Sequence, residues 1–223
     1  MEQPVIRNII FDFGGVVCNI DVSITEKAFT DLGLRQFDTG YSVTDRESLF
    51  GSFETGQITP AQFREALKPY FNRPVTDEEI DRAWNALLQD IPASRIALLR
   101  SLSKHYRLFL LSNTNEIHYI KYLKELQAVY GVSGFGDLFE KAYFSFQVGL
   151  RKPFREVFDF VVMDAGILAD ETLFIDDSPQ HVEGARNAGL FGYHLLGKED
   201  ILDLFTPEMK FQRPLSSPPF SPG

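Results

Sequence analysis

Four short segments of the chain carry side chains that together could perform phosphoryl transfer. Three of them close apolar runs and one is a basic pair before a proline; in chain order they are Asp12, Ser112-Asn113-Thr114, Arg151-Lys152-Pro153 and Asp176-Asp177. They supply a carboxylate nucleophile, hydroxyl and amide donors for an anion, a positive charge and a pair of hard oxygen ligands. Phosphoryl transfer through an aspartate needs these groups, because its nucleophile must approach an anion whose charge has to be neutralised.

Asp12 is the candidate nucleophile. It follows Asn8-Ile9-Ile10-Phe11 and precedes Phe13-Gly14-Gly15, a turn whose glycines let the backbone fold closely around whatever the carboxylate touches. An aspartate in such a turn also has a purely structural interpretation, as a residue that stabilises the turn. The presence of the other three segments favours the interpretation of Asp12 as an attacking carboxylate that forms an aspartyl-phosphate.

Asp176 and Asp177 follow the apolar run Thr172-Leu173-Phe174-Ile175. Two adjacent negative charges at a buried strand end are costly unless a cation or a shared proton relieves them. Clustered carboxylates suit Mg²⁺, which binds through one or two of them together with substrate phosphate and water. The pair therefore predicts a magnesium site shared with Asp12.

Ser112, Asn113 and Lys152 are candidates for holding phosphate. Ser112 and Asn113 precede a predicted helix, so they offer polar donors and a helix N-terminus to an anion. Ordinary helix capping would explain the same residues, but a cap can also bind a ligand. Lys152 could neutralise the charge that develops when a carboxylate meets a phosphate, although a lone surface lysine would be unremarkable.

The elements that must position these residues form an α/β pattern. Short apolar runs alternate with amphipathic segments, which is typical of a doubly wound parallel sheet, and helices are expected at 115–130, 154–165 and from Pro179. Strands are predicted at about 7–12, 107–112, 141–146, 172–176 and 191–195. Because ligands bind beyond the carboxyl ends of parallel strands, Asp12, Ser112 and Asp176 should share one crevice.

An insertion separates the first two strands, which lie about 95 residues apart, too far for one crossover helix. Capping boxes at Thr59 and Thr76, each followed by amphipathic sequence, predict a helical cap at 18–90. The expected core domain is then 1–17 and 91–211, followed by a Pro/Ser-rich tail at 212–223 expected to be flexible or polyproline-like yet to rest on its own domain or a neighbour. Cap residues that could overhang the crevice are Tyr41, Phe50, Phe53 and Glu54, most of which are expected to form cap core.

Composition limits the partners. The 223 residues carry 22 Lys and Arg against 31 Asp and Glu, a net charge of -9, which disfavours nucleic acid and anionic membranes as partners. No apolar stretch approaches a membrane span and no signal segment opens the chain, so a cytoplasmic protein is expected. The single cysteine, Cys18, is expected in the core. A monomer or homodimer acting on a small phosphorylated metabolite fits these properties.

The ordered set Asp12-x-Gly14, Ser112-Asn113-Thr114, Lys152 and Asp176-Asp177 resembles the four motifs of the haloacid dehalogenase (HAD) superfamily, over nearly the whole chain. The helical insertion resembles that superfamily's first (C1) cap class, and the local sequences are most similar to its glucose-1-phosphatase-like sugar-phosphate phosphatases. The resemblance implies a Rossmann-like core, Asp12 as nucleophile, and Ser112 and Lys152 on the phosphate. It also implies Mg²⁺ held by Asp12, the backbone carbonyl of Gly14 and the Asp176-Asp177 pair, with Asp177 as the better match for the direct ligand.

Gly14 departs from the pattern, since most phosphatases of the superfamily have an acid/base aspartate at this position. Glycine preserves the backbone carbonyl but removes an acid and base whose loss is expected to cost about 100- to 10,000-fold in rate. A good leaving group such as an anomeric hydroxyl, or another side chain, could compensate. Asp21 and His118 are candidate substitutes, with helix capping and a helix-surface position as their respective structural interpretations.

Two other functions compete with a magnesium-dependent phosphatase, and a third fits less well. A carbon–halogen hydrolase also uses an aspartate nucleophile and needs neither the second acid nor a metal, but the acidic pair Asp176-Asp177 argues against it. A non-catalytic module that binds phosphate or a partner would account for Gly14 as a loss of turnover. A phosphoacceptor signalling domain fits less well, because such domains place the acidic pair at the first strand and the acceptor later.

Overall fold

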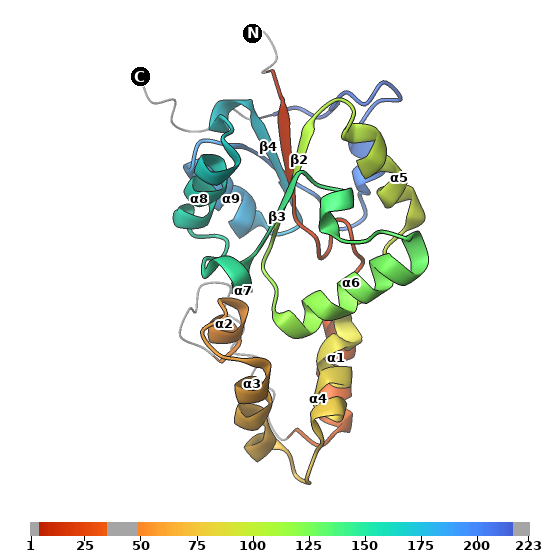
Figure 1. Ribbon diagram of the computed structural model, residues 1–223, viewed down its shortest axis with the longest axis vertical. Helices are drawn as coiled ribbons and strands as arrows, with labels where there is room; N and C mark the ends of the chain where they lie inside the picture. Colours follow the sequence, from red (N-terminus) through yellow and green to blue (C-terminus); the bar gives the residue numbers. More distant parts are fainter. Residues whose placement is uncertain (1–4, 35–48, 216–223) are drawn as a thin grey trace.

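The computed structural model describes residues 5–34 and 49–215, and its centre is a five-stranded parallel sheet. The strand order is β3-β2-β1-β4-β5, so β1, which Asp12 directly follows, lies in the middle (Figure 1). The predicted doubly wound α/β fold is confirmed. The strands are β1 (Asn8–Phe11), β2 (Arg107–Ser112), β3 (Lys141–Phe144), β4 (Thr172–Asp176) and β5 (Phe191–His194).

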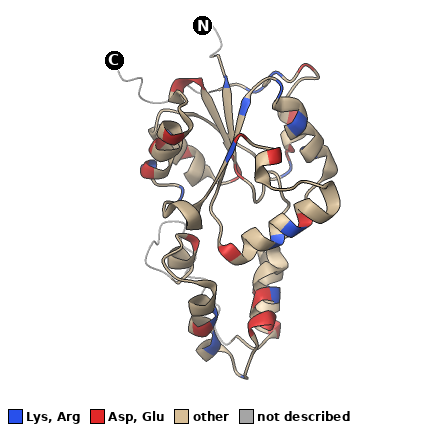
Figure 2. Ribbon diagram, in the orientation of Figure 1, with Lys and Arg blue, Asp and Glu red and all other residues tan. Residues whose placement is uncertain are grey.

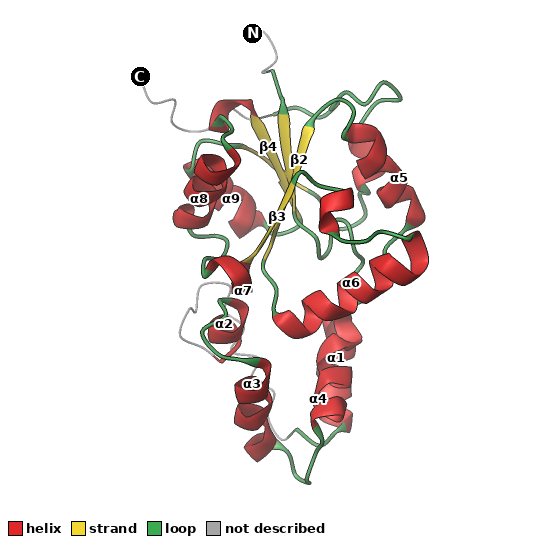
Figure 3. Cartoon of the chain, in the orientation of Figure 1, coloured by secondary structure: helices red, strands yellow, loops and turns green. Residues whose placement is uncertain are grey.

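Helices cover both faces of the sheet, as the helix and strand colours in Figure 3 show. Side chains of β1 alternate between the faces: Ile9 and Phe11 belong to one buried cluster, and Ile10 to the other. A strand buried on both sides needs the unbroken apolar run that the sequence has. The helices of the sheet domain are α5 (Ala93–Leu102), α6 (Glu116–Tyr130), α7 (Ser145–Val148), α8 (Arg155–Ala165) and α9 (Pro179–Asn187).

One predicted strand ends early. β3 stops at Phe144, and 145–148 forms the short helix α7 instead of continuing the predicted strand to 146. The Ser145 hydroxyl accepts from the Thr114 backbone N–H and donates to the Thr114 carbonyl, at 2.9 Å each, so it fixes the chain where it leaves the sheet. Gly149 then ends α7 in a left-handed conformation with φ of 72°.

A separate group of helices follows β1 and extends away from the sheet (Figure 1). The capping boxes predicted at Thr59 and Thr76 are both present. Phe63 and Trp84 are central to the aromatic interior of this group, and Phe53 stacks on Phe63 with ring centroids 4.2 Å apart. The helices are α1 (Val22–Asp31), α2 (Leu49–Glu54), α3 (Pro60–Leu67) and α4 (Asp77–Trp84).

Ion pairs tie the outer part of these helices together, where acidic and basic residues lie side by side in Figure 2. Arg64 on α3 pairs with Asp81 on α4 at 2.7 Å, and Lys68 pairs with Asp77 at 2.8 Å. Where the chain enters and leaves this group, Ile20 and Leu88 form an antiparallel bridge. The segment that enters the helical group and the segment that leaves it therefore lie side by side and connect it to the sheet domain.

Five single-turn 3₁₀ helices complete the described part of the chain: η1 (Lys68–Tyr70), η2 (Asn85–Leu87), η3 (Phe135–Asp137), η4 (Ala169–Glu171) and η5 (Ile201–Leu204). Of the predicted tail, 212–215 is described and lies on the sheet domain. Gln212 donates its backbone N–H to Leu204 O, and Arg213 pairs with Glu199, both at 2.9 Å. The rest of the tail lies outside the described residues. No helix in the described ranges is both long and apolar enough to cross a membrane.

Candidate active site

The carboxyl ends of the central strands meet one cavity of about 380 Å³ between the sheet and the helical group. Phe11, the last residue of β1, pairs in register with Leu110 of β2 and Ile175 of β4, so Asp12 follows the strand close to the carboxyl ends of both neighbours. Asp12 and Ser112 line this cavity as expected, whereas Asp176 is fully buried and does not line it. Its lining includes Asp12, Gly14, Ser112, Asn113 and Asp177 from the sheet edge, and Thr25, Glu26, Phe50, Glu54 and Trp84 from the helical group.

Lys152 is a fully buried side chain that joins two of the carboxylates. Its Nζ lies 2.9 Å from Asp12 Oδ1 and 2.6 Å from Asp176 Oδ2, and it donates to the Leu111 carbonyl at 2.9 Å. These contacts account for the three hydrogens of the ammonium group. The lysine is therefore held beside the candidate nucleophile, which excludes the alternative of a lone surface lysine.

Asp176 serves as an anchor for its surroundings. Besides Lys152, it accepts from the Ser178 backbone N–H at 2.8 Å and lies 3.0 Å from His181 Nδ1. Burial raises the pKa of Asp176, but Lys152 and His181 outweigh burial and hold the pKa below its ordinary value. An ionised carboxylate only accepts hydrogen bonds, so His181 must carry its proton on Nδ1.

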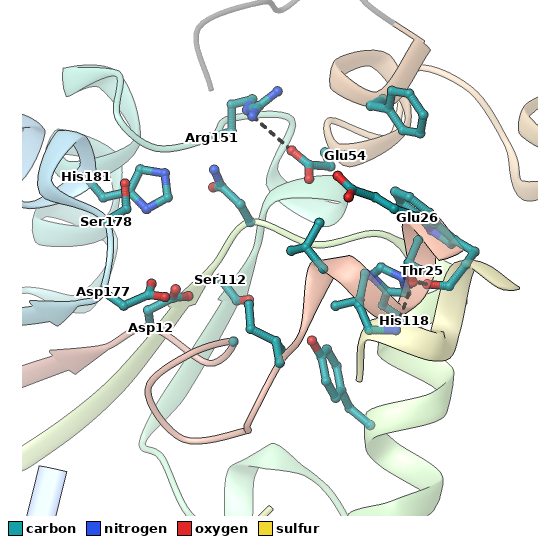
Figure 4. A pocket seen from close by; sticks show the side chains of 18 residues that line it. Asp12, Thr25, Glu26, Glu54, Ser112, His118, Arg151, Asp177, Ser178 and His181 are labelled. Atoms are coloured by element: carbon teal, nitrogen blue, oxygen red, sulfur yellow. Dashed lines mark hydrogen bonds and ion pairs between the residues drawn. The ribbon is translucent and has the colours of Figure 1, made fainter. Parts of the chain in front are cut away.

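Asp177 lies against the glycine turn that follows Asp12. Gly15 has φ of +79°, and a Cβ built there would meet Asp177 Oδ2 at 2.1 Å. Only glycine leaves room for this carboxylate. In Figure 4, Asp12 and Asp177 project their oxygens toward one another at the same edge of the cavity. Two segments more than 160 residues apart thus bring their carboxylates together.

The charges at this edge do not balance among the described residues. Asp12 and Asp176 contact the ammonium group of Lys152, and Asp177 adds a third carboxylate close enough to interact electrostatically with it. Burial raises the pKa of Asp12 well above its ordinary value, the ammonium opposes this rise, and the two other carboxylates add to it. Burial and the neighbouring Asp176 also raise the pKa of Asp177. Clustered hard oxygens with surplus negative charge are a donor set that fits a divalent cation such as Mg²⁺.

His181 is a further candidate ligand that the sequence did not indicate. Ligand atoms of Asp12, Asp176 and His181 lie within 4.8 Å of one another. However, His181 Nδ1 is engaged with Asp176, and its buried Nε2 has no hydrogen-bond partner among the described residues. Asp177 has the harder donor atoms and faces Asp12, so we favour Asp177 over His181 as the metal ligand. The spacing of five residues from Asp176, across the start of α9, could have pointed to His181 as its partner.

Ser112 and Asn113 have different surroundings. Ser112 is buried and lines the cavity near Asp12 (Figure 4). Asn113 forms two hydrogen bonds of 2.9 Å with the Lys152 backbone, donating from Nδ2 to its carbonyl and accepting at Oδ1 from its N–H. Asn113 therefore positions Lys152, which leaves one amide hydrogen for any ligand.

Both candidate replacements for the acid/base residue are held by other hydrogen bonds, although His118 lines the cavity. Asp21 caps α1 by accepting from Ser23, as its structural interpretation predicted, and it does not line the cavity. His118 is buried rather than on a helix surface, so that interpretation is wrong. Its Nε2 lies 3.0 Å from the Trp84 carbonyl and its Nδ1 3.2 Å from Asn115 Nδ2. Burial lowers the pKa of His118 to about 4, so the ring is neutral near pH 7.

Of the cap residues that the sequence indicated, some line the cavity and others are buried in the interior of the helical group. Phe50 and Glu54 line the cavity, whereas Phe53 is 2% exposed and does not line it. Tyr41 lies outside the described residues. Arg151, considered in the sequence only together with Lys152, also lines the cavity and pairs with Glu54. Cys18 is buried in the core as predicted.

The parallel sheet and the carboxylates around Lys152 are the arrangement expected of the hydrolase family that the sequence motifs resemble. Comparison with known families leads to the same family. The model of the haloacid dehalogenase-like hydrolases matches residues 6–189. The chain belongs to this family, and the resemblance seen in its four motifs is confirmed.

Particular relatives are similar over nearly the full length. The chain is 32% identical over 203 residues to the D-ribitol-5-phosphate phosphatase of Bacteroides thetaiotaomicron, covering 91% of this chain and 92% of that one. It is 26% identical to a sesquiterpene phosphatase of Aspergillus oryzae, covering 83% and 88%. A HAD family enzyme of B. thetaiotaomicron, solved in complex with magnesium and inorganic phosphate, superposes with a TM-score of 0.82 at 36% identity, covering 90% and 100%.

Proposed function

We propose that this protein is a magnesium-dependent phosphatase that hydrolyses a small phosphomonoester through an aspartyl-phosphate on Asp12. The observation that carries the proposal is the convergence of Asp12 and Asp177 at one sheet edge, with Lys152 bridging Asp12 and Asp176. The similarity to two phosphatases, and to an enzyme that binds magnesium and phosphate, supports it.

The metal would be held by Asp12, the backbone carbonyl of Gly14 and Asp177, with Asp176 behind them. When bound, Mg²⁺ would offset the surplus negative charge and allow the Asp12 carboxylate to approach an anionic phosphate. Asp176 would act mainly by holding Lys152 and His181, because its oxygens already accept from these side chains and from Ser178. The donors that remain are those of Asp12 and Asp177.

The chemistry then divides into two steps. An oxygen of Asp12 attacks the phosphorus atom in line with the leaving oxygen, so that one P–O bond forms and the other breaks. The positive charge of Lys152 and the hydroxyl group of Ser112 stabilise the phosphoryl oxygens during this transfer, and Asn113 keeps Lys152 in place. Water then attacks the aspartyl-phosphate, which releases inorganic phosphate and restores Asp12.

The absence of an acidic side chain at Gly14 limits which leaving groups can depart. A side chain there would reach the cavity, but glycine offers no acid to protonate the departing oxygen. Neither Asp21 nor His118 compensates, because Asp21 caps a helix and His118 is neutral and hydrogen-bonded. A substrate whose leaving oxygen is a good leaving group, such as the anomeric oxygen of a sugar phosphate, fits this site better than a simple alkyl phosphate.

The position of the cavity between the sheet and the helical group also suggests separate roles for two domains. Residues 1–17 and 91–211 would form the catalytic core, and 18–90 a cap that closes the cavity over the substrate. Supporting this division, the described helices α1 to α4 share an aromatic interior distinct from the two clusters that flank the sheet. Ile117 of α6 joins that interior, so the cap also rests on the core at this helix.

The test is a screen of small phosphate monoesters with purified protein, with Mg²⁺ and with excess chelator. We expect release of phosphate only with Mg²⁺ and its loss in Asp12→Asn. Asp159→Asn is a matched control, because Asp159 is half exposed on α8 and pairs with Arg155 outside the cavity. Activity that survives in Asp12→Asn, or haloacid hydrolysis that survives the chelator, would overturn the proposal.

A further inference from the structure

A buried ion pair spans the two sides of the cavity. Arg151, in the loop between α7 and α8, places Nη2 3.1 Å from Oε2 of Glu54, at the end of α2. The side chains are only 3% and 5% exposed, and both line the cavity that contains Asp12. A pair of opposite charges at such depth is costly to form unless further hydrogen bonds satisfy it.

Arg151 has unused hydrogen-bonding capacity. Its Nε is buried and has no hydrogen-bond partner among the described residues. A guanidinium group offers five N–H donors in a plane, and a carboxylate beside it offers acceptor oxygens, so the pair can both donate to and accept from a hydroxyl group. A polyol presents hydroxyl groups that need both.

The backbone on each side holds the pair in place. Lys152, the next residue, is fixed on Asp12, Asp176 and Asn113, which sets the position of Arg151 relative to the reacting centre. On the cap side, the turn after α2 approaches the core so closely that a Cβ at Gly56 would lie 2.2 Å from the Phe146 carbonyl. Figure 4 shows Arg151 and Glu54 across the cavity from Asp12 and Asp177. The pair therefore faces the part of a substrate that lies beyond its phosphate.

The charged residues around Arg151 and Glu54 disfavour a substrate that carries a second anionic group. Among the described lining residues, Arg151 is the one arginine or lysine, and Glu54 already neutralises it. Glu26 adds a further carboxylate on the cap side (Figure 4). A substrate with a distal carboxylate or second phosphate would thus face negative charge without an available cation among the described residues that line the cavity.

We propose that Arg151 and Glu54 form the recognition pair for the distal hydroxyl groups of an uncharged sugar monophosphate, for which a polyol phosphate is a probe, and that the pair excludes substrates with a second anionic group. The inference rests on the proposed phosphatase function and assigns its specificity. The pair contacts the distal hydroxyls, while Asp12 and Lys152 act on the phosphate.

The test compares three phosphate monoesters of equal chain length: a five-carbon polyol phosphate, n-pentyl phosphate and the phosphate of a five-carbon sugar acid. p-Nitrophenyl phosphate, with its good leaving group, reports the chemistry without distal hydroxyls. We expect kcat/KM for the polyol phosphate to exceed that for n-pentyl phosphate by about 10- to 100-fold, the range of hydrogen bonds to charged groups. The sugar-acid phosphate should be at least about 10-fold poorer than the polyol phosphate.

Glu54→Gln gives the sharper result because it frees the Arg151 charge. We expect the preference for the polyol over the sugar-acid phosphate to fall by about 100-fold or to reverse, since a carboxylate can then pair with Arg151. A residue that only supported the fold would lower kcat/KM for all substrates in parallel. Glu65→Gln is the matched control, because it removes an exposed carboxylate that pairs with Lys68 outside the cavity.

Arg151→Lys provides a second variant if Glu54→Gln fails to fold, since it keeps the charge but loses the planar donors. It should reduce the polyol preference over n-pentyl phosphate about 10-fold. No hydrolysis of p-nitrophenyl phosphate by the wild type would overturn the proposed function itself. Hydrolysis of that ester with equal kcat/KM for the polyol and n-pentyl phosphates, or with parallel losses in Glu54→Gln, would overturn the recognition pair alone.

Discussion

The Nζ atom of Lys152 lies 2.6 Å from Oδ2 of Asp176, and neither side chain is exposed to solvent. The same ammonium is bonded to Asp12, so one positive charge keeps two buried carboxylates in place. We expect both stability and the proposed catalysis to depend on this contact, because its loss would leave Asp12, the proposed nucleophile, and Asp176 without a counter-charge.

Lys152→Met should lower the free energy of unfolding by about 3 to 5 kcal/mol, the usual consequence of removing one partner of a buried ion pair. It should also lower kcat by about 100- to 1,000-fold, as loss of a group that stabilises transition-state charge does. Urea unfolding and phosphate release measure the two effects. Lys141→Met is the control: Lys141 pairs with Asp164 at 2.5 Å but is half exposed, so its loss should cost at most about 1 kcal/mol. Equal stability of the two variants would contradict the role given to Lys152.

Gly15→Ala should weaken Mg²⁺ binding by about 10-fold or more, because the new Cβ would collide with Asp177 Oδ2 and displace the carboxylate that we propose binds the metal. The comparison is with Gly131→Ala. Gly131 also has positive φ, +62°, but no atom lies within 4 Å of its Cβ position, so this variant carries the backbone strain without the collision. Titration calorimetry with Mg²⁺ should separate the two, and equal affinities would show that Asp177 does not bind the metal.

Gly14→Asp should restore a general acid and base. A Cβ at this position would lie 3.5 Å from Ile20 Cγ2 and 3.9 Å from the Tyr122 hydroxyl, which are ordinary contact distances. We expect kcat for an alkyl phosphate to rise by about 100-fold, and kcat for p-nitrophenyl phosphate to rise much less, because a good leaving group needs no proton. Gly14→Asn has the same size without the acid and should give no gain. If both variants raised kcat alike, the missing acid would not be what limits turnover.

The apolar runs and their order along the chain were sufficient to predict the sheet, because strands buried on both faces cannot be interrupted by polar residues. The sequence also predicted that Asp12, Ser112 and Asp176 lie at one edge of the sheet, because parallel strands all end at the same edge. The end of β3 was missed because it depends on a hydrogen bond between Ser145 and Thr114, two residues from different segments.

The remaining parts of the site depend on contacts that local sequence does not encode. Arg151 and Glu54 are 97 residues apart in sequence and meet only where the cap touches the core. His118 reads as a polar residue on a helix, yet packing places its ring against Trp84, with ring centroids 4.8 Å apart. Such residues can be identified only when the position of the cap is known.

The buried ring of His118 predicts a pH-dependent stability. Its pKa is about 4 in the folded protein against 6.5 ordinarily, so the unfolded chain takes up a proton first as the pH falls. Stability is fully present above pH 6.5 and decreases toward pH 4, by about 2 to 3 kcal/mol at pH 4.5. His118→Gln keeps a donor for the Trp84 carbonyl but does not titrate. The difference in unfolding free energy between wild type and His118→Gln should therefore shift by that amount between pH 7 and 4.5. A constant difference would mean that the ring is accessible to protons.

The most direct measurement is a crystal structure of the protein grown with magnesium and beryllofluoride, a mimic of an aspartyl-phosphate. We predict beryllofluoride attached to Asp12 and next to Lys152 and Ser112, with one magnesium ion bound between Asp12 and Asp177. A well-ordered structure in which Asp12 carries no adduct, or in which no metal lies between these two carboxylates, would contradict this prediction.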